Sequence, residues 1–318
     1  MTCSSTSPML TFRGNGKLLL TGEYFVLDGA LALALPSPLG QSLTIRPNDT
    51  SQLHWQSFDK QGQEWFSVVF EPRDFSFTRA THTDIAQRLQ QILTAIRKQQ
   101  PQFLRDGIGR DVQTRLEFPR LWGLGTSSTL IYALSSWAAV DPYLLLRDTF
   151  GGSGYDIACA AATQPIFYQI EAGCAQVQSV DFSPSFQQDL YFVYLGKKQN
   201  SRSGIQHYRA KVQTDRGLLG DISALTKAVA TASTKNSFGQ LLLQHEQLVA
   251  QAVALPRAQE RYFVDFDGVV KSLGAWGGDF VLAVSHLNQD RTRTYFYEKG
   301  FRTVVSYADM VTFASKQL

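Results

Sequence analysis

The first seventy residues alternate between short apolar runs and turn residues, a pattern that predicts β structure. Apolar runs cover residues 18–20, 24–27 and 31–35, and Gly22 and the Asp28-Gly29 pair separate them. An Asp-Gly pair between two apolar runs is a strong hairpin signal. Three more strands are predicted at residues 41–46, 52–56 and 64–70.

Helical spacing replaces this pattern after residue 83. Apolar side chains recur at helical intervals over residues 84–100, where Thr83 is the predicted cap and Pro101 the predicted stop. A strand at 112–118 and a helix at 127–139 follow. Further elements of the first half are helices at 141–149 and 155–162 and a hairpin formed by residues 166–170 and 175–180.

The second half alternates strands and helices. Strands are predicted at 190–195, 280–285 and 302–305, helices at 218–231, 238–252, 259–272 and 291–299, and a polar, basic loop at 197–204. No Gly/Ser-rich linker marks the midpoint. We place a domain boundary at this midpoint, between residues 183 and 184. Because no flexible linker lies there, we expect the two halves to pack together.

Composition narrows the possible classes of protein. The chain has 318 residues, of which 44% are hydrophobic and 18% charged, as in globular proteins with a substantial core. The net charge of +3 comes from scattered Lys and Arg residues, so we expect no nucleic-acid partner. Polar residues interrupt the longest apolar run, at 130–146, so we expect no membrane span.

Cysteine usage and the first residues favour a cytoplasmic protein. Cys3, Cys159 and Cys174 show no metal-like spacing, and three cysteines do not make a disulfide framework. The first residues have neither a basic segment nor an apolar one, so they predict no secretory signal. Nothing in the sequence decides between a monomer and a homodimer.

The most informative stretch lies between the predicted strand at 112–118 and the predicted helix at 127–139. It contains Gly123 and Gly125, which permit a tight turn and a close approach to a ligand, and small hydroxyl residues follow at the helix start. Unpaired N–H groups and the helix dipole make such a start a phosphate cradle. A helix cap preceded by a glycine turn explains the stretch equally well. The P-loop and the dinucleotide fingerprint both fail to match, because Leu18 follows Gly16-Lys17 and Ser128 stands at the third glycine position.

Three further segments carry candidate chemistry. Lys17 heads an apolar strand, where a lysine is costly unless it pairs with an anion, although its ammonium can also reach water. Asp156 follows a glycine loop at 151–154 at a helix start, where an aspartate is often only a cap. Residues 271–279 form a third glycine-rich stretch, which a tight turn also explains.

In this order, the four segments together resemble the GHMP small-molecule kinases, which include galactokinase, homoserine kinase, mevalonate kinase and phosphomevalonate kinase. Residues 17–24 (Lys-Leu-Leu-Leu-Thr-Gly-Glu-Tyr) are similar to the family's first motif and closest to its phosphomevalonate kinases. Residues 123–128 (Gly-Leu-Gly-Thr-Ser-Ser) resemble the second motif. Residues 152–158 resemble the segment that contains the catalytic aspartate, and residues 274–279 resemble the third motif.

The resemblance implies an α+β fold of two lobes: a mixed α/β ATP-binding lobe at residues 1–183 and a ferredoxin-like lobe at 184–318. It implies ATP-dependent phosphorylation of a hydroxyl or phosphate group on a small anionic metabolite, with mevalonate and phosphomevalonate as the first choices. Lys17 and Asp156 would be catalytic and Ser127 would bind Mg²⁺. The residues expected to hold ATP are Gly123, Leu124, Gly125, Thr126, Ser127 and Ser128.

Expected substrate contacts extend over several segments: Glu23, Gly154, Lys197, Arg202, Gly274 and Gly277. The Lys and Arg residues are included because an anionic acceptor needs positive partners, although a solvated loop explains them too. A kinase for homoserine or a sugar, and an inactive binding protein of the same fold, stay open as alternatives.

The chain departs from the family pattern in two respects. Trp122 and Trp276 bring bulk into loops that are usually built from small residues. The carboxylate that would share Mg²⁺ is open as well, because neither Asp141 nor Asp148 matches the expected position.

Overall fold

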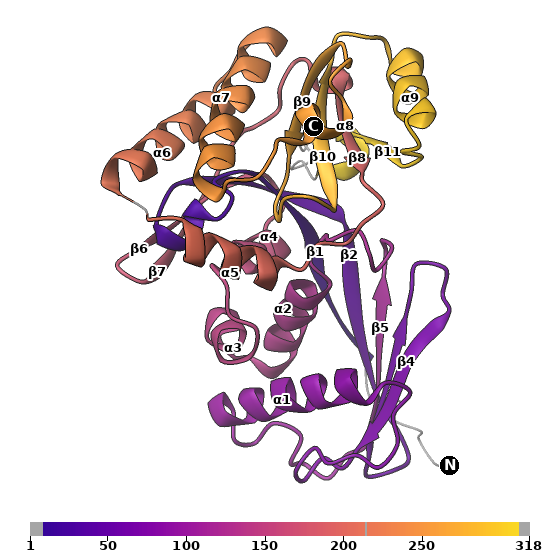
Figure 1. The fold of residues 1–318 in the computed structure, drawn as a ribbon. Helices are drawn as coiled ribbons and strands as arrows, with labels where there is room; N and C mark the ends of the chain where they lie inside the picture. Colours follow the sequence, from indigo (N-terminus) through magenta and orange to yellow (C-terminus); the bar gives the residue numbers. More distant parts are fainter. Residues whose placement is uncertain (1–8, 214, 312–318) are drawn as a thin grey trace, which may run out of the picture. The chain divides into compact units, whose positions relative to one another are not determined.

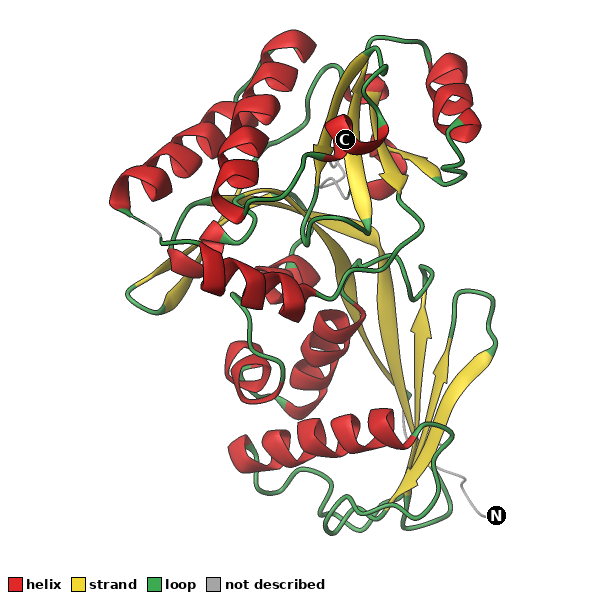
Figure 2. Ribbon diagram, viewed as in Figure 1, coloured by secondary structure: helices red, strands yellow, loops and turns green. Residues whose placement is uncertain are grey.

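The computed structural model describes residues 9–213 and 215–311 as a mixed α/β protein, in which eleven strands form two sheets and ten α-helices accompany them (Figures 1 and 2). The chain divides into two compact units. The first contains residues 39–120, 125–161 and those up to 16; the second contains residues 17–38, 121–124 and those from 162 onward. The predicted boundary at 183/184 lies within the second unit, and a division into lobes at that point stays a prediction.

Two long strands, β1 (Leu10–Thr21) and β2 (Ala32–Pro47), pair with each other and contribute residues to both units. In the first unit, strands lie in the order β4 (Glu64–Phe70), β3 (Leu53–Phe58), β5 (Arg110–Leu116) and residues 41–47 of β2. The β3–β5 pair is parallel and the others are antiparallel. Alternate residues of β3 are buried, so one face of this sheet forms a core.

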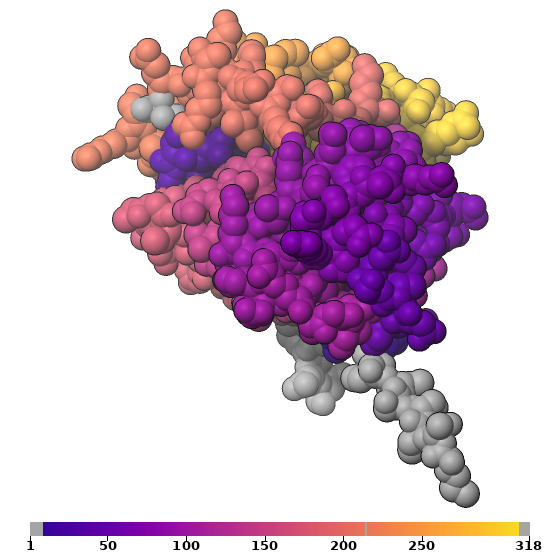
Figure 3. Space-filling view, turned by 90° about the horizontal axis from the view of Figure 1, so that it is seen from below, coloured from indigo at the N-terminus to yellow at the C-terminus, as the bar shows by residue number. Residues whose placement is uncertain are grey.

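Helices of the first unit pack on that core. They are α1 (Thr83–Gln99), α2 (Thr126–Ala138), α3 (Pro142–Thr149) and α4 (Tyr155–Ala161). Trp55 and Phe70 from the strands join Leu93 of α1 and Ile131 of α2 in one hydrophobic cluster. In the space-filling view, residues of this unit, in purple, form a continuous surface on the side shown (Figure 3).

The second unit contains a separate antiparallel sheet in the order β11 (Val304–Ser306), β8 (Leu190–Tyr194), β10 (Phe280–Ser285), β9 (Gly268–Ser272). Every residue of β10 is buried, as expected for a central strand. Residues 32–34 of β2 pair with β6 (Ile166–Glu171), which forms a hairpin with β7 (Cys174–Ser179).

Six helices complete the described part of the second unit. Helix α7 packs against both α6 and β9 (Figure 1). The helices are α5 (Ser201–Lys211), α6 (Arg216–Ala230), α7 (Lys235–Val253), α8 (Ala258–Tyr262), α9 (Gln289–Glu298) and α10 (Tyr307–Met310). No helix among the described residues has the length and apolar character needed to cross a membrane.

Most predicted elements are confirmed to within a few residues, including the 166–180 hairpin and helices α1, α2, α6 and α7. Cys159 is buried and Cys174 exposed, and neither forms a disulfide; Cys3 lies outside the described residues.

The strand predicted at 24–27 was wrong. The segment forms a 3₁₀ turn, η1 (Phe25–Asp28), between Gly22 at φ 85° and Gly29 at φ 92°. Val26 N–H donates to the Gly22 carbonyl oxygen, so the apolar run turns back on itself instead of extending. The predicted Asp28-Gly29 hairpin turn therefore becomes the end of this 3₁₀ turn.

The strands predicted at 31–35 and 41–46 form the single strand β2, and other details differ from prediction as well. Residues 259–272 form the short helix α8 followed by strand β9, because Gly268 at φ 149° breaks the segment and the β-branched Val269 and Val270 favour a strand. The loop predicted at 197–204 is shorter, because the Asn200 side chain accepts from Arg202 N–H and starts α5 at Ser201. Thr83 is the first residue of α1, and the cap is His82.

Candidate active site

The first half of the predicted phosphate loop belongs to the second unit and lies beside strand β1. Lys17 N–H donates to the Leu124 carbonyl oxygen at 3.0 Å, and Leu124 is fully buried. Gly123 has φ 68°, and a Cβ there would lie 2.4 Å from Cγ of Asp279. Only glycine meets both demands at this position, so its presence follows from the geometry of the loop.

The second half of the loop, in the first unit, is the start of α2. Gly125, at φ 93°, is the N-cap and offers no side chain to the helix N–H groups. The Ser128 hydroxyl donates to the Gly125 carbonyl oxygen at 2.9 Å and is turned inward, whereas Ser127 is exposed. The start of a thirteen-residue helix without a capping side chain leaves backbone donors for an anion, and Ser127 adds an accessible hydroxyl.

Thr129, near the start of α2, is held by its neighbours in the first unit. Its hydroxyl donates to the Gln41 side-chain oxygen at 2.8 Å. A Cβ on Gly14 would lie 2.9 Å from the Thr129 carbonyl oxygen, so the absence of a side chain at Gly14 allows the close approach. Thr129 is therefore an internal support of the loop.

Asp156 occupies the first turn of α4, which packs against α2. Its Oδ1 accepts from Ile157 N–H at 3.1 Å. Burial raises the pKa of Tyr143 to about 12, and neighbouring Cys159, Asp141 and Asp156 add to that rise. Tyr143 is thus close to Asp156 in the first unit. Gly154, at φ 88°, accepts from Ile157 and Ala158 N–H and starts the helix.

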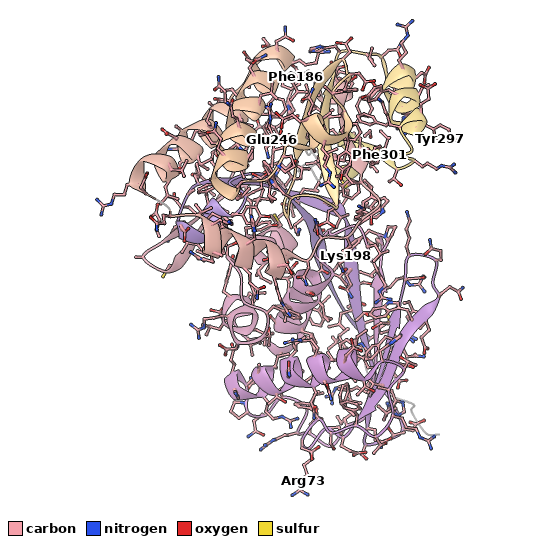
Figure 4. All side chains as sticks on the ribbon, viewed as in Figure 1. Arg73, Phe186, Lys198, Glu246, Tyr297 and Phe301 are labelled. Atoms are coloured by element: carbon pink, nitrogen blue, oxygen red, sulfur yellow. The ribbon has the colours of Figure 1, made fainter. Side chains whose placement is uncertain are left out.

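The third glycine-rich loop joins β9 to β10 in the second unit, and the segment after β8 lies on it. Gln199 Nε2 donates to the Trp276 carbonyl oxygen at 2.9 Å, and Gln199 N–H donates to Asp279 Oδ1 at 3.1 Å. A Cβ on Gly277 or Gly278 would lie within 2.7 Å of atoms of this segment. These glycines therefore make room for residues 197–199, which include Lys198 (Figure 4).

The two tryptophans of the glycine loops, Trp122 and Trp276, pack within the second unit. Trp276 is only 5% exposed, and its backbone N–H donates to the Tyr24 hydroxyl at 3.2 Å. Tyr24 stacks on Tyr208, with ring centroids 5.5 Å apart. The Trp122 ring meets Phe280 edge to face at 5.3 Å. The extra bulk in these loops thus serves aromatic packing.

A fully buried polar cluster lies behind the third loop. Glu23, Lys271 and His245 are each 0% exposed, and Lys271 Nζ donates to both Glu23 Oε1 and the Ser272 carbonyl oxygen. His245 Nε2 accepts from Gly22 N–H at 2.9 Å, so the imidazole is neutral. Glu246, on α7 (Figure 4), accepts from Ser272 N–H at 2.8 Å.

Burial dominates the protonation of this cluster. It raises the pKa of Glu23 to about 7, although the adjacent Lys271 pulls it down. Burial also raises the pKa of Glu246 and, with Lys271, drives the pKa of His245 well below its usual value. The carboxylate of Glu23 is buried against Lys271, and the substrate contact predicted for Glu23 stays a prediction.

The remaining predicted residues fall into two groups. Lys197 and Arg202 are exposed, and with Gly274 and Gly277 they belong to the second unit together with Lys17. Asp156, Gly154 and the start of α2 belong to the first. The structure thus brings Lys17 to the loop at Leu124 and places Asp156 in the first turn of α4, and the assigned roles stay predictions.

Neither acidic residue considered for Mg²⁺ is a strong candidate. The Asp141 carboxylate caps α3 by accepting from Tyr143 and Leu144 N–H, and Asp148 pairs with Arg147 at 3.4 Å. No group of three or more His, Cys, Asp or Glu residues suited to a metal occurs in the described part of the chain. A nucleotide-bound Mg²⁺ keeps water and phosphate ligands, so one protein oxygen such as that of Ser127 fits it.

Asp279 was not among the site residues predicted from the sequence, yet its side chain lies against Gly123. Its φ of 52° is rare for a non-glycine residue, and burial raises the pKa of its carboxyl group. The acidic residue at the end of the glycine loop was visible in the sequence, but its contact with a distant glycine was not.

Comparison with solved structures identifies the fold. Mevalonate kinase from Methanococcus jannaschii aligns with a TM-score of 0.71 at 14% identity, covering 97% of this chain and 99% of that one. The chain has the fold of the GHMP kinases. Two other members also align: phosphomevalonate kinase from Streptococcus pneumoniae in complex with phosphomevalonate and AMPPNP (TM-score 0.67, 17% identity, 93% and 99% covered), and galactokinase from Lactococcus lactis complexed with galactose (0.67, 13%, 98% and 96%). No family model matches the sequence, and no curated protein matches it.

The buried ion pair predicts a large, pH-dependent cost for Lys271→Met. At pH 8, where Glu23 is mostly ionised, the variant leaves a buried carboxylate unpaired, so we expect a loss of about 3 kcal/mol in the free energy of unfolding. The double variant Glu23→Gln/Lys271→Met should recover much of that loss. Denaturant unfolding measures both, with a substitution of an exposed lysine on α6, Lys227→Met, as a control expected to stay within about 0.5 kcal/mol. Equal losses for the single and double variants would contradict the pairing.

The raised pKa of Glu23 predicts a second effect. Between about pH 4.5 and 7 the folded protein keeps a proton that the unfolded chain has released, so this contribution to stability is full below 4.5 and is lost as the pH rises through 7. The stability difference between wild type and Glu23→Gln should therefore shift against wild type from pH 5 to 8. Melting temperatures at several pH values measure it, and a flat or opposite trend would exclude a raised pKa.

Proposed function

We propose that the protein is an ATP-dependent kinase that phosphorylates a small anionic metabolite, with mevalonate and phosphomevalonate as the first acceptors to test. The observation that carries the proposal is the glycine loop at 123–128, which contains the start of a helix without a capping side chain. The carbonyl oxygen of Leu124 in this loop accepts a hydrogen bond from Lys17 N–H. The shared fold supports it, because the solved relatives are kinases and one was solved with phosphomevalonate and AMPPNP.

In this proposal, backbone N–H groups of residues 124–128 hold the β- and γ-phosphates. The exposed Ser127 hydroxyl is a ligand of Mg²⁺, which supplies charge neutralisation to the transferring phosphoryl group. Lys17 adds positive charge where negative charge accumulates. Phosphoryl transfer depends mainly on such positioning and charge stabilisation.

Asp156 has the role of orienting the acceptor hydroxyl and receiving its proton. A carboxylate in the first turn of a helix is stabilised as an anion by the N–H groups around it, which makes it a weak base. A loose transition state requires no stronger base, because the hydroxyl loses its proton late.

Substrate choice rests on the positive side chains at the start of α5 and before it. Lys197 and Arg202 are exposed, so an anionic acceptor can approach them from solvent. A neutral sugar carries no charge with which these side chains can pair. Since galactokinase shares the fold, homoserine and sugars stay in the acceptor panel.

An ADP-release assay tests the function directly. Purified protein with ATP and Mg²⁺ is offered mevalonate, phosphomevalonate, homoserine and galactose in turn. We expect turnover with one of the two anionic isoprenoid precursors, well above the ATPase background. ATP binding without turnover on any acceptor would favour an inactive binding protein, and absence of both would refute the kinase proposal.

With an acceptor in hand, Asp156→Asn should lower kcat by at least about a hundredfold, because the variant cannot take the proton. Its Kd for MgATP should stay within about threefold of wild type. Asp148→Asn is the matched control, since Asp148 is an exposed aspartate nearby in sequence that pairs with Arg147. Unchanged turnover in Asp156→Asn would remove Asp156 from the mechanism.

A further inference from the structure

Asp279 is held in an unfavourable backbone conformation by its neighbours. Its N–H donates to the Lys197 carbonyl oxygen at 2.6 Å, and its carbonyl oxygen accepts from Leu195 N–H at 2.8 Å. Its Oδ1 accepts from Gln199 N–H at 3.1 Å. The φ of 52° costs free energy for any residue with a Cβ, and residues of this kind concentrate at functional sites. Two backbone hydrogen bonds and one to the carboxylate thus tie Asp279 to residues 195–199.

The carboxylate of Asp279 points at the predicted phosphate loop. A Cβ built on Gly123 would lie 2.4 Å from both Cγ and Oδ2 of Asp279 and 2.7 Å from Oδ1. The side chain therefore packs directly on the Gly123 backbone. Leu124, the next residue, accepts the hydrogen bond from Lys17 N–H. All of these residues belong to the second unit.

Charge links Asp279 to the same loop. Burial raises the pKa of the Asp279 carboxyl group, whereas the positive charge of Lys17 lowers it and Lys198 adds a smaller effect. Lys17 is thus an electrostatic neighbour of the carboxylate. A partly desolvated negative charge beside a loop built for anions is unfavourable for any phosphate that enters without a cation.

We propose that Asp279 sets the charge selectivity of the phosphate site: its carboxylate repels metal-free polyphosphate, so the loop selects nucleotide that carries a divalent cation. This inference rests on the proposed kinase function and adds a specificity residue to it. Metal-free ATP carries about two more negative charges than its Mg²⁺ complex, and Coulomb repulsion scales with that charge. The repulsion therefore falls mainly on the unproductive form.

The shape of the loop does not require the charge. An Asn side-chain oxygen can accept from Gln199 N–H as Asp279 Oδ1 does, and Asn tolerates positive φ better than most residues. The variant Asp279→Asn therefore removes the charge and keeps the geometry. Asp279→Gly, which suits the same φ, is a second variant that removes the side chain altogether.

Isothermal calorimetry of ATP binding, once with Mg²⁺ and once with excess EDTA, tests the proposal. We expect Asp279→Asn to bind metal-free ATP about tenfold more tightly than wild type does, with the Kd for MgATP changed less than about threefold. Asp279→Gly should shift the metal-free Kd in the same direction. Asp267→Asn is the control, because Asp267 is an exposed aspartate at the opposite end of β9 and should leave both constants unchanged.

Three other outcomes would each contradict the inference. An unchanged Kd for metal-free ATP in both Asp279 variants would overturn the inference while leaving the kinase proposal standing, provided that wild type binds MgATP. Weaker MgATP binding with unchanged metal-free binding would also overturn it, because Asp279 would then be a metal ligand. Wild type that binds neither form would overturn the inference together with the proposed function.

Discussion

The buried ion pair between Glu23 and Lys271 is the interaction on which the arrangement of the second unit's glycine loops depends. The two residues are separated by 248 positions in sequence and are both 0% exposed. Glu23 directly follows Gly22 at the end of β1, and Lys271 lies near the end of β9, three residues before the third glycine loop. Because an unpaired charge in that interior is costly, the pair fixes where these two strand ends meet.

Other contacts extend this arrangement from the pair to the loops. Tyr24, next to Glu23, is held at φ 63°, stacks on Tyr208 and accepts the Trp276 N–H. The same strand β1 carries Lys17 beside Leu124, and the loop after β9 ends in Asp279 against Gly123. The residues proposed to handle phosphate thus lie on segments that the ion pair anchors.

Local patterns in the sequence predicted the parts of the fold that depend on local physics. Helix α1 follows from its apolar spacing, the 166–180 hairpin from its alternation, and the glycine loop from two residues that accept positive φ. The 24–27 turn could not be separated from a strand, because a short apolar run fits either until Gly22 and Gly29 take up their dihedral angles. Residues 259–272 contain a helix and a strand, and the Asp267-Gly268 pair between them is a turn signal that the prediction of one helix did not take into account.

The site residues, too, were predictable only where a local sequence motif marks them. Lys17, Asp156 and the 123–128 loop were identifiable because each belongs to a short motif. The partner of Glu23 and the contact of Asp279 depend on residues far along the chain, and a single sequence does not show such pairs. The sequence therefore suggested only a substrate contact for Glu23, and its burial against Lys271 became visible in the structure.

Amide hydrogen exchange with a non-hydrolysable MgATP analogue tests the central claim most directly, because it reports on the backbone N–H groups said to hold phosphate. We expect at least about tenfold slower exchange for amides between Leu124 and Ser128 at saturating analogue, and little change in the exposed β7 strand, Cys174–Ser179. Unchanged exchange across the loop under conditions where the analogue is bound would contradict the account.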